Sequence, residues 1–400
     1  MGNLKTRAAA SSPAEVFLVF LRLGVTSFGG PVAHLGYFRD EFVARRKWLD
    51  EASYADLVAL CQFLPGPASS QVGLAVGLSR AGYAGALAAW AGFTLPSAIA
   101  LTLFAFGVGA LGDAAGSAWL QGLKIAAVAV VAQAVLGMMR SLAPDRERAS
   151  LAVAAAVIAL AVPSALGQVA AIVLGGLAGL LLLPGAETDG HRPSLPLAVS
   201  RRAGAIALVV FFALLAGLPL AATGSSDQAL QLFDSFYRAG SLVFGGGHVV
   251  LPLLQSEVVP SGLIGNDAFL AGYGAAQAVP GPLFTFAAYL GALIGGWGTA
   301  ALCLVAIFLP SILLVIGVLP FWETIRKRTS AQAALRGVNA AVVGLLLAAL
   351  YDPVWTAGIR GPKDFALAAL AFLLLFAWRT PPWLVVMLSA AAAAAVAALR

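Results

Sequence analysis

The sequence predicts an all-α polytopic integral membrane protein whose two homologous halves form an inverted-topology repeat. Composition, an internal duplication and the placement of Lys and Arg lead to this fold class. Hydrophobic residues make up 60% of the 400 residues and charged residues 10%, and the mean hydropathy is +0.92. So little polar surface cannot cover a water-soluble protein of this size. Apolar stretches near the ~20 residues that cross a ~30 Å hydrocarbon core recur along the chain, as at 84–106, 119–139, 203–222 and 299–320.

The duplication is visible as an ordered series of motifs. FLRLGVTSFGGP, QFLPGPASS and FTLPS in the first half are echoed by FYRAGSLVFGGG, QAVPGPLFT and FLPS in the second. The interval from Phe28 to Phe244, the motif phenylalanines, nearly equals the interval from Pro65 to Pro280, which open the Pro-Gly-Pro runs. Chance would not keep one separation through a series, so we expect duplicated structural units. The predicted divisions are a first repeat at 1–142, a linker with connecting membrane helices at 143–227, a second repeat at 228–356 and C-terminal membrane helices at 357–400.

Lys and Arg are distributed unequally between matched loops. The loop at 39–47 is rich in Arg and Lys whereas its counterpart at 255–267 has neither, and the reverse holds for 107–122 and its counterpart at 322–337. Because cytoplasmic loops accumulate these residues, each matched pair is predicted to lie on opposite sides of the membrane. In such an inverted repeat, transporter sites lie near the midplane where the halves meet. The net charge of +6 is spread over short loops, so nucleic-acid binding is not expected.

Each half contains a segment interrupted by Pro-Gly-Pro. Proline lacks a backbone donor and clashes with the preceding turn, so we predict a broken membrane helix or a re-entrant hairpin here; a kinked full span is the alternative. A helix that restarts inside the membrane presents free N–H groups and the positive end of its dipole, which suits an anion. The predicted substrate-binding residues are Gln62, Pro65, Gly66, Pro67, Ser69, Ser70 and Gln71 in the first half and Gln277, Pro280, Gly281, Pro282 and Thr285 in the second.

The FGG motifs add positive charge. Arg22 and Arg238 each precede the motif phenylalanine by six residues, inside otherwise apolar stretches. A guanidinium in a membrane is costly and indicates function, unless it reaches the interface by snorkelling. Its planar fork can donate two parallel hydrogen bonds to a tetrahedral oxyanion, and the motif glycines allow close backbone approach. From this element we predict binding by Arg22, Gly29, Gly30, Arg238, Gly245, Gly246 and His248.

Other polar residues inside the apolar segments are candidates for coupling. They are Asp56, His34, Lys124 and Asn339, of which the last two occupy matched positions. The counterpart of Asp56 is an alanine, but coupling needs only one proton site. With three histidines and two dispersed cysteines, the chain offers neither a metal site nor a nucleophile beside a base. No metal, cofactor or enzymatic activity is therefore predicted.

The composite motifs resemble those of the chromate ion transporter family in its long, two-domain form. The similarity covers roughly residues 15–140 and 228–356. It rests on FGGPVAHLGYFRDEFVARRKWLDE and YADLVALCQFLPGPASSQVGLAVG in the first half, and on GYGAAQAVPGPLFTFAAYLGA and GVNAAVVGLLLAALYDPVW in the second. Motifs of this length are far more specific than a short glycine signature.

The resemblance implies a multi-pass protein of the prokaryotic inner membrane that exports chromate and confers chromate resistance, with protons as the coupling ion. Sulfate is a near isostere of chromate, so competition between the two is expected. Uptake of sulfate or another oxyanion is the alternative transport function, and a passive anion channel is the alternative of a different class. The expected partners are chromate or sulfate, protons and the lipid bilayer, and a homodimer is compatible with the sequence.

Overall fold

The structure is a computed structural model that describes residues 11–111, 118–183, 199–244, 247–325 and 327–398. Within these ranges the chain is helical and contains no strand. Length and apolar composition suit six segments to crossing a membrane: Ala68–Val108, Ala118–Leu142, Ala165–Leu182, Arg201–Thr223, Leu283–Ile325 and Thr329–Gly358. The predicted all-α multi-pass membrane fold is confirmed.

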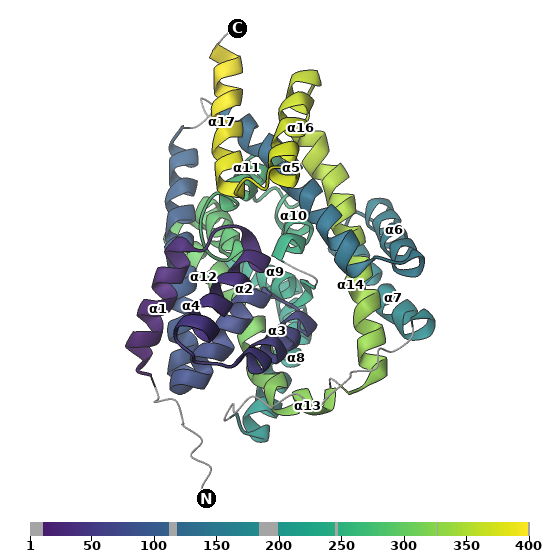
Figure 1. Ribbon diagram of the computed structural model, residues 1–400. Helices are drawn as coiled ribbons and strands as arrows, with labels where there is room; N and C mark the ends of the chain where they lie inside the picture. Colours follow the sequence, from purple (N-terminus) through teal and green to yellow (C-terminus); the bar gives the residue numbers. More distant parts are fainter. Residues whose placement is uncertain (1–10, 112–117, 184–198, 245–246, 326, 399–400) are drawn as a thin grey trace, which may run out of the picture.

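The first half starts with short helices and ends with long ones (Figure 1). Its elements are α1 (Pro13–Thr26), α2 (Gly30–Arg39), a π-helical turn (Asp40–Arg45), α3 (Glu51–Phe63), α4 (Ala68–Leu111) and α5 (Ala118–Leu142). A side chain caps the start of α3, because the Asp50 carboxylate accepts a hydrogen bond of 2.8 Å from the backbone N–H of Ser53. Hydrogen bonding with Ser53 lowers the pKa of this loop carboxyl. α3 ends just before Pro-Gly-Pro and α4 begins just after it, so the predicted break is present.

The second half repeats this order. Its elements are α9 (Gln228–Leu242), the 3-10 turn η3 (Gly247–Val249), α10 (Val250–Val258), α11 (Asn266–Ala276), the 3-10 turn η4 (Leu283–Thr285), α12 (Phe286–Val318), η5 (Leu319–Phe321), α13 (Trp322–Ile325) and α14 (Thr329–Ala349), followed by η6 (Leu350–Trp355) and α15 (Thr356–Gly358). Along the chain, α6 (Arg146–Ala161), α7 (Ala165–Leu182) and α8 (Arg201–Thr223) follow α5, and α16 (Pro362–Phe376) and α17 (Pro382–Ala398) follow α15.

Both long helices are hairpins rather than straight rods. α4 leaves helical geometry at Gly82 (φ +62°) and α12 does so at Gly296 (φ +75°), which occupy corresponding positions of the two halves. In α4, Gly77 packs directly against the backbone of Gly85. Residues eight apart in a straight helix would be separated by about 12 Å. Each long helix therefore folds back on itself at the same point of the repeat.

The halves exchange backbone hydrogen bonds reciprocally. The N–H of Gly66 donates to the carbonyl of Val243 (2.6 Å), and the N–H of Gly281 donates to the carbonyl of Ser27 (3.0 Å). Each Pro-Gly-Pro break thus bonds to the residue before the FGG motif of the other half. This is the pattern that a two-fold axis between the halves produces. Together with the opposed loop charges, it fits an axis lying in the membrane plane.

Two further helix pairs, α6 with α7 and α16 with α17, cover the outside of this core. α6 and α7 pack against α14, with Gly175 and Gly179 against Gly337, and α17 packs against α5, with Gly122 on the backbone of Ser389. Figure 1 shows α6 and α7 beside α14 and the yellow C-terminal helices beside α5. Close backbone approach at small residues is the usual way in which membrane helices associate. The junction of the halves is therefore enclosed by helices from several parts of the chain.

Candidate functional site

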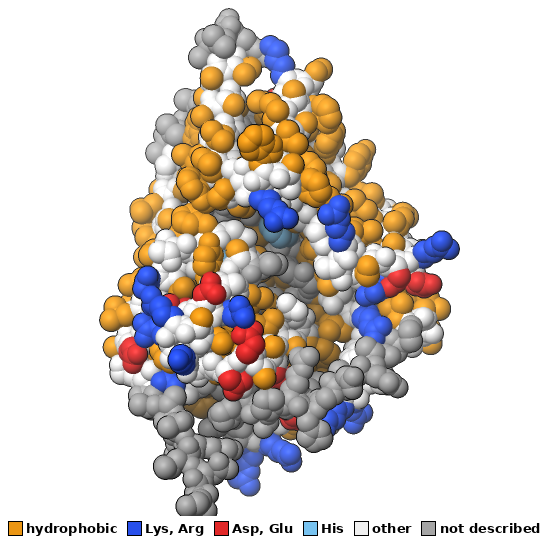
Figure 2. Space-filling view, in the orientation of Figure 1, with side chains coloured by type: hydrophobic (Ala, Val, Ile, Leu, Met, Phe, Trp, Pro, Cys, Tyr) orange, Lys and Arg blue, Asp and Glu red, His pale blue; other side chains and the backbone are white. Residues whose placement is uncertain are grey.

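Two adjoining cavities lie at the junction of the halves, with volumes of about 260 Å³ and 560 Å³. They share the lining residues Gly29, Pro31, Ala134, Gly137 and His248. In Figure 2 a histidine side chain is visible inside a hollow near the centre of the face, with Lys or Arg side chains near its rim. The predicted site region therefore contains cavities lined by residues of both halves.

Four helices begin at these cavities. The smaller cavity is lined by Gly30, where α2 starts, and by Leu283, where η4 leads into α12. The larger is lined by Ala68, where α4 starts, and by Gly247, where η3 leads into α10. The first N–H groups of a helix have no intrahelical partner, and each helix start carries about half a positive charge. The two starts at each cavity supply about one positive charge there, and the four together about two.

Glycine is required where the chain turns into these helices. Gly66 has φ +119° and Gly281 has φ +100°, a region that other residues rarely adopt. Both positions are also crowded. A Cβ on Gly66 would collide with the Ser311 hydroxyl, and one on Gly281 would lie 2.8 Å from the Ser97 hydroxyl. Each Pro-Gly-Pro break therefore fits tightly against the Leu-Pro-Ser motif of the opposite half.

Polar side chains complete the lining. Gln277 lines the smaller cavity, whereas Gln62 and Asn339 line the larger. The Nε2 of Gln277 and the Oδ1 of Asn339 are buried without a hydrogen-bond partner among the described residues. His248 lines both cavities, and its Nδ1 lies 2.9 Å from the Tyr273 hydroxyl. Of the two unpaired atoms, the Nε2 of Gln277 is a donor that suits an anion, whereas the Oδ1 of Asn339 can only accept a hydrogen bond.

Several predicted residues do not line the cavities but form hydrogen bonds at or near the Pro-Gly-Pro breaks. Gln71 donates from Nε2 to the carbonyl of Pro65 (2.6 Å), and the Thr285 hydroxyl donates to the carbonyl of Pro282 (2.7 Å). The Ser69 hydroxyl lies 3.3 Å from Nδ1 of His34. The buried residues in this supporting layer are His34, Pro67, Ser69, Ser70, Gln71, Pro282 and Thr285, and Pro65 and Pro280 are half-buried.

The structure does not bring the two predicted arginines to the cavities. Arg22 is exposed on the outer side of α1, together with Leu18 and Val25. Position 22 lies opposite the buried stripe of this amphipathic helix, so its side chain snorkels along the surface. Arg238 is half-buried but forms ion pairs with Asp234 (2.8 Å) and Glu257 (2.9 Å). Neither guanidinium is placed to hold an ion in the cavities.

The remaining predicted residues are scattered. Asp56 is buried and accepts a hydrogen bond from the indole Nε1 of Trp322 (3.3 Å). Lys124 is buried and forms an ion pair with Asp267 (2.9 Å) at the start of α11. Gly245 and Gly246 lie outside the described residues. Of the four coupling candidates, Asn339 is the one that lines either of the two cavities.

Sequence reasoning missed one wall of the site. Gln133, Gly137 and Ser141 line the cavities from α5 at intervals of four residues, which places them on one helix face. That spacing of small and polar residues in an apolar helix was the signal that could have identified them. Pro382 of α17 also lines the smaller cavity. It was missed because the predicted second repeat ended at residue 356.

Comparison with known proteins gives a consistent result. The family model described as "Chromate transporter" matches residues 14–180 and 230–395. The chromate transport protein of Pseudomonas aeruginosa is 31% identical over 94% of this chain and 90% of its own length. The chromate transport protein of Cupriavidus metallidurans is 27% identical over 93% and 90%, and a probable chromate transport protein of Synechococcus elongatus is 26% identical over 85% and 84%. No solved structure shows significant similarity.

Proposed function

Because the chain belongs to the chromate transporter family, we propose that it exports chromate from the cytoplasm across the inner membrane, driven by the proton gradient, and so confers chromate resistance. The family is one of transporters, not of enzymes, and the described helices make this a multi-pass membrane protein. The anion's direction of movement, its coupling to protons and the host membrane are part of the proposal.

The observation that carries the proposal is the meeting of four helix starts at two cavities between the halves. A tetrahedral dianion leaving water must recover hydration energy from N–H donors and positive charge. The four helix starts offer both N–H donors and positive charge; they belong to α2, α4, η3 with α10, and η4 with α12. The unpaired Nε2 of Gln277 adds a side-chain donor. Partial charges on backbone groups bind an anion without trapping it as tightly as a bare arginine pair would, which suits a transporter.

Chromate and sulfate share the charge and shape that such a site recognises, so selectivity between them has to be measured. We expect inverted membrane vesicles that contain the protein to accumulate radiolabelled chromate against its gradient, and a protonophore to abolish this accumulation. Sulfate should compete for the same site. Vesicles made from cells that lack the protein serve as the control.

Two results would contradict the proposal. Accumulation of sulfate in right-side-out vesicles, with no chromate accumulation in inverted ones, would favour the oxyanion-uptake function. Flux that only dissipates an existing chromate gradient, whether or not the protonophore is present, would make the protein a channel.

A further inference from the structure

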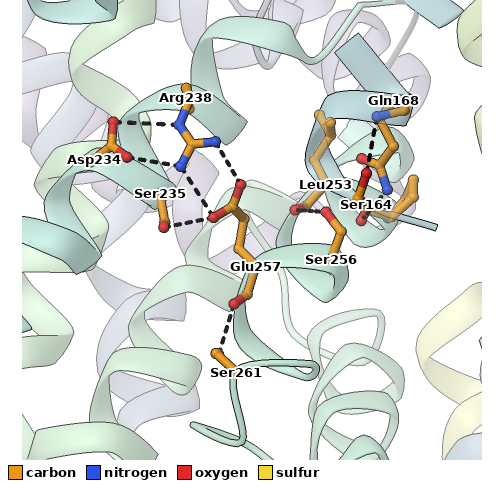
Figure 3. Close-up of polar contacts among 11 residues, drawn as sticks. Ser164, Gln168, Asp234, Ser235, Arg238, Leu253, Ser256, Glu257 and Ser261 are labelled. Atoms are coloured by element: carbon orange, nitrogen blue, oxygen red, sulfur yellow. Dashed lines mark hydrogen bonds and ion pairs between the residues drawn. The ribbon is translucent and has the colours of Figure 1, made fainter. Parts of the chain in front are cut away.

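One arginine is shared by two carboxylates between α9 and α10. Arg238 donates from Nη2 to Asp234 (2.8 Å) and to Glu257 (3.2 Å), and its Nη1 lies 2.9 Å from a second oxygen of Glu257. Figure 3 shows the guanidinium between the two carboxylates. The side chains of Asp234 and Glu257 are 7% and 15% exposed, so the group is largely removed from solvent.

This triad carries an uncompensated negative charge when both carboxylates are ionised. The elements packed against α10 are α9, α7, α14 and η3. α7 contains no charged residue, and Arg336, the single charged residue of α14, forms no ion pair with Glu257 among the described residues. The titratable residue of η3 is His248, which lines the anion cavities instead. A buried net charge inside a membrane protein is costly and is read as functional by default, and binding one proton would remove it.

Glu257 is better placed than Asp234 to take up that proton. Asp234 and Arg238 lie four residues apart on one helix, so their pairing persists whatever the neighbouring helix does. Glu257 reaches Arg238 from a different helix. It also accepts a hydrogen bond from the Ser235 hydroxyl (2.8 Å), and a cavity of about 10 Å³, roughly the volume that admits one water molecule, lies against it and Arg238. That space can hold a water molecule beside the Glu257 carboxylate.

The triad and the anion site belong to the same structural unit. α9 leads directly to Val243, whose carbonyl accepts the hydrogen bond from Gly66, and α10 begins beside His248, which lines both cavities. The ion pair between Arg238 and Glu257 joins these two helices some distance from the cavities. A change in this pair alters how α9 and α10 are held together, and hence the geometry of two of the segments that form the site.

We propose that Glu257 is the residue that binds and releases the coupling proton, an inference that rests on the proposed function. A proton from water adds to a carboxylate oxygen of Glu257, and the ion pair with Arg238 is lost. Arg238 stays paired with Asp234, so the triad becomes neutral. Release of the proton to water restores the pair and the negative charge.

The repeat supplies a matched control. Glu41 precedes Glu257 by the same interval that separates Phe28 from Phe244, so it holds the corresponding position of the first half. It forms ion pairs with two arginines, Arg45 and Arg46. The charges around Glu41 are balanced, because one of its two arginine partners, Arg46, also pairs with Glu15. A carboxylate held by two guanidinium groups has no reason to bind a proton near neutral pH. Glu41→Gln therefore removes a carboxylate at the equivalent place without removing the proposed proton site.

The test uses purified wild type, Glu257→Gln and Glu41→Gln in liposomes at clamped membrane potential. For one coupled proton, the steady-state chromate ratio across the membrane should change about tenfold per pH unit of imposed gradient. We expect wild type and Glu41→Gln to follow this relation. Glu257→Gln should hold the ratio near one while still exchanging labelled for unlabelled chromate at equal pH. A wild-type response to the pH gradient in Glu257→Gln would overturn the proposal.

A second variant keeps the proposal testable if Glu257→Gln loses exchange as well. In Asp234→Asn, Glu257 no longer shares Arg238, so its charged form is favoured and the midpoint of the pH profile of chromate exchange should move to lower pH. An unshifted midpoint would overturn the assignment. Absence of chromate transport in the wild type itself would instead contradict the proposed function, so the two failures are distinguishable.

Discussion

Alanine in place of Gly66 is expected to abolish chromate transport. The residue has φ +119°, and forcing a residue with a side chain into such a region costs about 1–3 kcal/mol. The new Cβ would also collide with the Ser311 hydroxyl and lie 2.7 Å from Nε2 of Gln71. Relief of this clash moves the Pro-Gly-Pro break, breaks the hydrogen bond from Gly66 to Val243 and displaces the start of α4 from the cavity. Chromate flux into liposomes measures the loss.

Gly281→Ala should have an effect of the same size, because the repeat places it in an equivalent environment. Its Cβ would lie 2.8 Å from the Ser97 hydroxyl and 3.2 Å from the carbonyl of Phe93. Gly217→Ala in α8 is the control, since a Cβ there meets nothing within 4 Å. Removing the obstructing hydroxyl with Ser311→Gly should restore part of the flux of Gly66→Ala. Normal flux in either single variant at normal membrane levels would show that the breaks do not shape the site.

Glutamate in place of Gln277 is expected to weaken chromate binding by about a thousandfold. The side chain lines the smaller cavity, and its Nε2 has no hydrogen-bond partner among the described residues. Even about 8 Å apart, a carboxylate and a dianion at an effective dielectric constant of about 20 repel by about 4 kcal/mol, and every 1.4 kcal/mol is about tenfold in affinity. Equilibrium binding of chromate to the purified protein measures the change.

Two further variants separate charge from loss of a hydrogen bond. Gln277→Leu removes the donor without adding charge, and we expect an affinity loss of about tenfold, the value of one hydrogen bond to a charged group. Gln231→Glu adds the same negative charge on the exposed surface of α9 and should leave affinity unchanged. Binding by Gln277→Glu as tight as that of the wild type would place the anion outside the cavity.

Much of the site could be predicted from the sequence because its elements are local and duplicated. Pro-Gly-Pro forbids a continuous helix wherever it occurs. The glycines of the FGG motif lack side chains, which allows close approach of the backbone. Since both signals recur at one common interval along the chain, the sequence also indicates that they meet between the halves. Gly30, Gly66, Gln62, Gln277 and Gly281 do lie together at the cavities.

The arginines could not be placed from the sequence, because the decisive facts are tertiary. Arg22 is on the outer side of α1, a matter of which helix face packs against α4. Arg238 is paired with Asp234 on its own helix and with Glu257 on another helix. A charge in an apolar stretch predicts that a compensating partner exists but does not say whether that partner is a substrate or a carboxylate. Pro382 was missed for another reason: the predicted second repeat ended at residue 356, whereas the family model matches through residue 395.

The charge that stabilises the anion is therefore assigned to four helix starts rather than to arginine side chains. The most direct test is a crystal of the chromate complex, with diffraction measured at the chromium absorption edge. The account predicts an anomalous chromium peak in the cavities, within hydrogen-bonding distance of backbone N–H groups at the helix starts near Gly30, Ala68, Gly247 or Leu283. A chromium peak beside Arg22 or Arg238, with none in the cavities, would contradict it.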